Sequence, residues 1–75
     1  MMLNWYETYN YGTRRKYWWT QRGTNGRCAE IRKNGKGKFN LLICETFKSE
    51  HNELQEAMDE AKKYVNGITN HIVRH

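Results

Sequence analysis

The alternation of apolar and polar residues in the middle of the chain predicts a β-hairpin. Within residues 38–45, Phe39, Leu41 and Ile43 share one face of a strand, and residues 27–33 place Ala29 and Ile31 on one face. Side chains of a strand alternate between its two faces, so the second run indicates one buried face and one facing water. Asn34-Gly35 lies between the runs, and this dipeptide is a strong hairpin signal.

Two further runs predict strands on the N-terminal side of this hairpin. Residues 16–22 are rich in aromatic side chains, and a second Asn-Gly pair at 25–26 separates them from 27–33. The three runs together predict an antiparallel meander. Residues 3–11 contain Trp, Tyr and Thr, which favour extended structure. They predict a strand at 4–9 or, alternatively, an arm whose rings cover the sheet.

The C-terminal part of the chain shows a helical period. Apolar residues recur at spacings of three and four, which is typical of an amphipathic helix, and we expect it at residues 50–66. Ser49 is a plausible N-cap, Asn52 with Gln55 is an alternative start, and Gly67 suits the position after the helix. The stripe consists of Leu54, Ala57, Met58, Ala61, Val65 and Ile68.

One sheet and one helix predict a single small α+β domain over residues 1–75. Its sheet would be a three- or four-stranded antiparallel meander packed against one amphipathic C-terminal helix. Ile72 and Val73 in the tail would dock on the core or add a short strand or helical turn. The sheet face away from the helix would be exposed, covered by the N-terminal aromatic segment, or buried in a partner.

Charge is unevenly distributed along the chain. The net charge is +5, of which residues 1–38 carry +7 and residues 39–75 carry −2. Aromatic residues make up 13% of the chain and are concentrated in the same N-terminal half. A basic half indicates a polyanion or an acidic protein surface as partner, and the alternative is a solvated surface that keeps the protein in solution.

Cations interleaved with aromatic rings point to nucleic acid. Lys and Arg contact phosphates and guanine edges, a β-ribbon fits the major groove of DNA, and exposed rings beside cations also suit single strands. The alternative places the tryptophans in the core and the cations on solvated turns. The predicted DNA-contacting residues, with double-stranded DNA as the favoured ligand, are Arg14, Arg15, Lys16, Trp18, Arg22, Arg27, Arg32, Lys33, Lys36 and Lys38.

Residues 14–66 resemble the DNA-binding domains built from a three-stranded sheet and one helix. The resemblance rests on strands with basic tips, a Gly-containing hairpin, and Phe47-Lys48-Ser49 before a helix that carries Ala57. These domains are the AP2 type and the arm-binding domains of phage integrases, in which the sheet lies in the major groove and the helix braces it. The resemblance implies contacts from Arg15, Trp18, Arg27, Arg32 and Lys38.

By class alone, the chain is similar to small phage-encoded accessory proteins, including anti-CRISPR and other host-takeover inhibitors. That resemblance implies a different function, in which an exposed aromatic sheet face or a sheet edge binds a host protein or nucleoprotein. A homodimer is a further possibility because a small sheet has apolar area to cover. We carry this inhibitor as the alternative to a DNA-binding accessory or regulatory protein.

The remaining residues give no catalytic or metal motif, so we expect neither an enzyme nor a cofactor. Cys28 and Cys44 match no zinc spacing with the three histidines. A three-residue hairpin loop would set Cys28 opposite Cys44, close enough to bridge, although buried reduced thiols are favoured in a cytosol. No signal peptide or membrane span is visible in the sequence, which predicts the cytoplasm, or the host cytosol for a phage protein.

Overall fold

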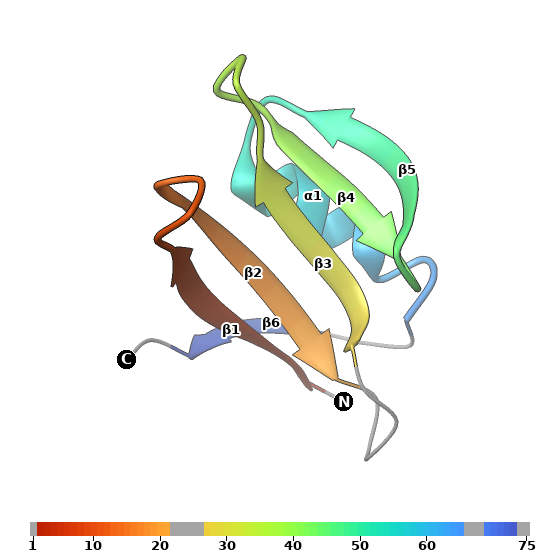
Figure 1. Ribbon diagram of the computed structural model, residues 1–75. Coiled ribbons are helices and arrows are strands. Elements are labelled where there is room, and N and C mark those ends of the chain that lie inside the picture. The colour runs from red at the N-terminus through yellow and green to blue at the C-terminus, as the bar shows by residue number, and fades with distance from the viewer. Residues whose placement is uncertain (1, 22–26, 66–68, 74–75) are drawn as a thin grey trace.

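The computed structural model describes residues 2–21, 27–65 and 69–73, and in them a six-stranded sheet carries one helix (Figure 1). The spatial order of the strands is β5-β4-β3-β2-β1-β6. Neighbouring strands run antiparallel except that β6 is parallel to β1. The elements are β1 (Met2–Asn10), β2 (Arg15–Gln21), β3 (Arg27–Lys33), β4 (Phe39–Ile43), β5 (Thr46–His51), α1 (Leu54–Ala61) and β6 (Thr69–Val73).

The α+β class is confirmed, while the predicted number of strands is too low. The four predicted strands correspond to β1–β4, and the bounds of β3 agree with residues 27–33. The N-terminal aromatic run is a strand within the sheet, paired with β2 on one side and β6 on the other, so the arm alternative is wrong. The predicted turn at residues 23–26 lies outside the described residues.

The helix is shorter than predicted at both ends, because residues 46–51 form strand β5 and because the helix ends at Ala61. Ser49 is not an N-cap; its hydroxyl oxygen lies 2.7 Å from the Nε2 atom of His51. The N-cap is Glu53, which makes no side-chain capping hydrogen bond. After Ala61 the chain continues in turns as far as Val65, which stays buried. Gly67 and Ile68 lie outside the described part of the chain.

A two-residue turn joins β4 to β5 without any sequence signal for it. Ile43 pairs with Thr46, so Cys44 and Glu45 alone form the loop, with φ of 48° and 65°. Positive φ at both central residues is typical of a type I′ hairpin, which matches the twist of the strands. Cys44 is exposed and free, so the prediction of a buried thiol is wrong for this residue. The side chain of Cys28 lies outside the described part.

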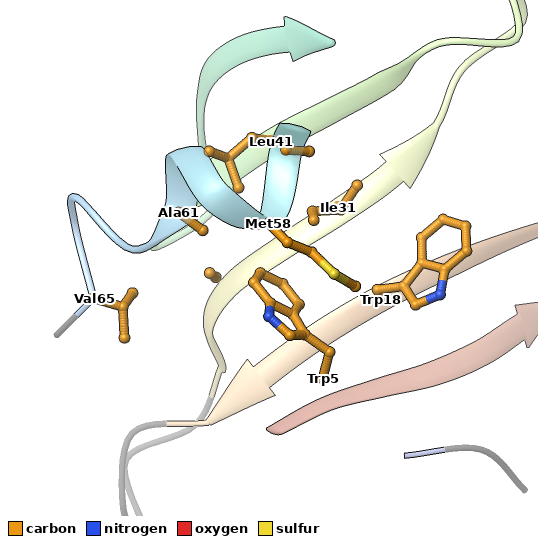
Figure 2. Packing of buried hydrophobic residues seen from close by; sticks show 9 residues of the cluster. Trp5, Trp18, Ile31, Leu41, Met58, Ala61 and Val65 are labelled. Atoms are coloured by element: carbon orange, nitrogen blue, oxygen red, sulfur yellow. The ribbon is translucent and has the colours of Figure 1, made fainter. Parts of the chain in front are cut away.

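The core lies between α1 and one face of the sheet, which we call the helix face. Trp18, Ile31 and Leu41 stand opposite one another on three adjacent strands and form its central row. Trp5 is 0% exposed, and Figure 2 shows the side chain of Met58 extending from α1 toward Trp5 and Trp18. The alternative that places the tryptophans in the core therefore holds for Trp5 and Trp18.

The opposite face, which we call the open face, carries no helix among the described residues. Tyr6 and Trp19 stack there with ring centroids 4.7 Å apart. Glu30, which the sequence predicts to face water, is only 6% exposed, and Arg32 donates to its carboxylate at 2.6 Å. Within the described residues α1 spans eight positions, and no helix there has the length and apolar character of a membrane span.

Candidate functional site

Two hairpin tips lie at the same end of the sheet. Residues 11–14 join β1 to β2, and residues 34–38 join β3 to β4 (Figure 1). Alternate turns of a meander lie at the same end, so cations far apart in sequence come together there. We call this region the basic end, and its cations are Arg14, Arg15, Lys16, Arg32, Lys33, Lys36 and Lys38.

Local hydrogen bonds shape both tips. The Oδ1 atom of Asn10 accepts the N–H groups of Gly12 at 2.9 Å and Thr13 at 3.2 Å. In the second tip the N–H of Gly37 donates to the carbonyl of Asn34 at 3.1 Å, and Gly37 has φ of 77°. A turn followed by a left-handed glycine is the common form of a three-residue hairpin loop, and glycine adopts that φ without a steric penalty.

Asn34 holds the second tip to the sheet. Its Oδ1 atom accepts the N–H groups of Lys36 at 2.9 Å and Lys38 at 3.1 Å. Its amide nitrogen donates to Asn40 at 3.0 Å and to Glu50 at 2.7 Å, so one side chain ties the loop to β4 and β5. The direction of the lysines in this loop therefore depends on Asn34.

The two tips also approach each other directly. A Cβ atom placed on Gly35 would lie 3.6 Å from the Nη2 atom of Arg15, which comes from the other tip. The guanidinium of Arg15 therefore reaches across to the backbone of the second hairpin. This proximity places the cations of the two tips on one surface.

A cleft lies between the tips on the helix face, and we call it the tip cleft. Tyr9 of β1 stands opposite Lys16 of β2, and Lys33 of β3 stands opposite Phe39 of β4. These four side chains form a row on the helix face at the end of the sheet that carries the tips. The cleft has a volume of about 620 Å³. It is lined by Tyr9, Arg14, Arg15, Lys16, Trp18, Lys33, Asn34, Gly35, Gly37, Phe39 and Leu54.

A second hollow lies at the same end on the open face. It has a volume of about 460 Å³, and the Glu30–Arg32 pair contributes to its wall together with Tyr17 and Asn40. Arg15, Lys16, Lys33 and Asn34 line both hollows. The basic end is thus a continuous edge with a recess on either side, and the recess on the helix face contains more apolar side chains.

Some charges of the basic end are compensated locally. Lys16 lies 4.0 Å from Glu7, Arg32 pairs with Glu30, and Lys38 lies 4.0 Å from Glu50. Within the described chain, four cations of this end form no ion pair: Arg14, Arg15, Lys33 and Lys36. An excess of positive charge therefore remains between and around the tips, where it attracts anions.

The structure gathers seven of the ten predicted contact residues at the basic end. Trp18 is 5% exposed and serves as cleft floor rather than as a surface ring. Arg27 begins β3 at the opposite end of the sheet, its side chain is outside the described part, and Arg22 is also outside it. Tyr9, Asn34, Phe39 and Leu54 were not predicted, although the aromatic run that contains Tyr9 was a signal.

Known proteins give no guide to this site. No protein family, no curated protein and no solved structure matches the chain. No cluster of three or more potential metal ligands occurs among the residues that the structure describes. The chemistry of the basic end is therefore that of guanidinium, ammonium, amide and aromatic groups, which bind anions and stack on flat rings.

Proposed function

We propose that the protein is a non-enzymatic DNA-binding accessory or regulatory protein that contacts the phosphate backbone with its basic end. One observation carries the proposal: cations from two hairpins that are about twenty residues apart in sequence meet at one end of the sheet. Four of them form no ion pair within the described chain. Phosphate contacts by Lys and Arg supply most of the affinity of such proteins.

The width of the sheet favours contact through the tips rather than through a flat face. Six strands spaced about 4.8 Å apart extend over about 24 Å. The major groove of B-DNA is about 12 Å wide, so it admits two or three strands only. A hairpin tip of the basic end, with Lys33 and Lys36, fits that width. This mode differs from the flat sheet implied by the resemblance to three-stranded domains.

The salt dependence of DNA binding tests this proposal. Replacing Lys33 and Lys36 together by alanine should make the slope of log affinity against log salt shallower by about 1.8, if each contacts one phosphate. The control replaces Lys62 and Lys63, which follow α1 and pair with acidic residues of the helix. Fluorescence anisotropy with a labelled duplex between about 50 and 200 mM salt measures both slopes.

The control variant removes the same net charge. A difference between the two variants therefore shows phosphate contacts at the basic end and not a general attraction of the positively charged protein to DNA. Equal slopes for the two double variants would place the contacts elsewhere on the molecule. Absence of binding to any nucleic acid at low salt would end the proposal. Phage origin and a location in the host cytosol remain predictions from the class resemblance. The anisotropy titrations test DNA binding whatever the origin of the protein.

The open face favours a second candidate function, which is binding of a host protein. Tyr6 and Trp19 stack on this face, and Phe47 at the β5 edge is 57% exposed. Aromatic residues are enriched at protein interfaces. A pull-down in which Phe47→Ser abolishes capture of one specific host protein, while Lys33→Ala does not, would favour this candidate over DNA binding.

A further inference from the structure

We infer that the tip cleft holds an unpaired nucleobase, so that the ligand is single-stranded DNA or DNA with an exposed base. The inference rests on the proposed contact of the basic end with DNA phosphates, and it replaces the duplex by DNA with an unpaired base as the preferred substrate.

The size of the cleft suits one nucleotide. Ligand sites have volumes of about 300 to 1,000 Å³, and the tip cleft, at about 620 Å³, lies within that range. A base within a duplex is stacked and paired, and it must leave the stack before it can enter such a recess. A single strand offers its bases without that cost, so the cleft favours unpaired DNA.

The floor of the cleft is apolar. The rings of Trp18 and Phe39 lie 5.6 Å apart, and Leu54 from α1 adjoins them. Phe39 and Leu54 are half-buried and line the recess, and the ammonium of Lys33 lies over the Phe39 ring, 5.9 Å from its centroid. Contact with a phosphate would bury no apolar surface of the ligand, whereas contact with the flat face of a base removes apolar surface from water and favours binding. The floor therefore distinguishes a base from the backbone.

Tyr9 supplies an aromatic ring at the rim. It is 43% exposed, and its ring meets that of Tyr11 in a T-shaped arrangement with ring centroids 4.8 Å apart. Base stacking on an exposed aromatic side chain is sequence-tolerant and changes affinity by about tenfold or more per base. Tyr9 is therefore placed to cover a base that rests on the floor.

Cations surround this apolar recess. Arg14, Arg15 and Lys16 come from one tip and Lys33 from the other side. Phosphates on either side of an inserted base would meet these groups, and Arg15, which adjoins both hollows, would guide the strand between the tips. The separation into apolar floor and basic rim matches the separation of base and phosphate in one nucleotide.

Three DNA ligands of equal length test the inference. They are a single-stranded thymidine oligomer, the duplex that it forms with a deoxyadenosine oligomer, and the same single strand with abasic sites. The natural single strand should bind the protein about tenfold more tightly than the abasic strand, because both carry the same phosphates. Tyr9→Ala should lower affinity for the natural single strand by about tenfold and leave that for the abasic strand unchanged. Tyr64→Ala, which changes another exposed tyrosine remote from the cleft, is the control.

The outcomes separate this inference from the proposed function. If the duplex and the abasic strand bind as tightly as the natural strand, the base-binding role is wrong while phosphate binding stands. If none of the three binds at low salt, both proposals fail. The comparison of natural with abasic strands uses the unmodified protein, so it decides the question even if Tyr9→Ala does not fold.

Discussion

Asn34 shows how a single side chain sets the geometry of the site. It accepts two backbone N–H groups of its own loop and donates to Asn40 and Glu50 on two neighbouring strands. The sequence analysis used Asn34 only as a turn former, through its dipeptide with Gly35. The bonds to β4 and β5 depend on strands that are adjacent only in the folded sheet, and no local pattern could predict them.

Replacing Asn34 by alanine should destabilise the protein by about 2 to 3 kcal/mol, because four hydrogen bonds are lost at a partly exposed position. Urea unfolding followed by tryptophan fluorescence measures this change. The control is Asn52→Ala, at an exposed position after β5, which should stay within about 0.5 kcal/mol. Equal effects of the two substitutions would mean that the Asn34 bonds add little to stability.

At the scale of elements, local patterns predicted those strands that have a local signature. Alternating residues and Asn-Gly located β3, β4 and the hairpin between them. The β5 strand was missed because Ser49 and Glu50 are typical of a helix start, and because the turn before it lacks Asn-Gly. The pairing of β6 with β1 joins the two ends of the chain, so only the tertiary fold determines it.

The turn between β4 and β5 contains two residues poorly suited to it. Cys44 and Glu45 both adopt positive φ, which costs non-glycine residues about 1 kcal/mol or more each. Replacing them by Asn-Gly should therefore raise the free energy of unfolding by about 1 to 2 kcal/mol. Chemical denaturation of the double variant measures the gain. The reversed pair, Gly-Asn, is a control of the same composition and should gain less.

The candidate site was partly predictable at the same scale. The basic tips were evident from the sequence, but the prediction grouped all cations of the N-terminal half into one surface. A meander places successive turns at opposite ends, so Arg27 at the start of β3 is remote from Lys33 at its end. The apolar floor was hidden because Phe39 and Leu54 appeared only as core residues of separate elements.

For the whole molecule, the position of α1 decides what stays accessible. The helix packs on β3, β4 and β5, while the side chains of Tyr9, Lys16 and Lys33 lie toward the tips. A helix of eight residues is about 12 Å long, which is less than the length of the sheet. The short helix therefore leaves the tip cleft open, whereas the predicted helix over residues 50–66 would have been about twice as long.

The free energy of unfolding of the protein should depend on the edge strand β6. Ile72 stands beside the fully buried Trp5 and packs against the core. Ile72→Ala should destabilise the protein by about 2 kcal/mol and loosen β6, so that backbone amides of residues 2–6 exchange faster. Hydrogen exchange read by mass spectrometry measures this. Leu42→Ala, at a half-buried position on the open face, should leave exchange in residues 2–6 unchanged if the effect is local to β6.

The parallel pairing of β1 with β6 has a consequence for the order of synthesis. β1 leaves the ribosome before β6, so it obtains one of its two neighbours only when residues 69–73 have also emerged. Until then the nascent chain presents the bare side of β1, and Trp5 lacks the cover of Ile72. An unpaired strand of this kind invites association with other chains. Chaperones that bind nascent polypeptides would therefore have the longest time to bind at β1.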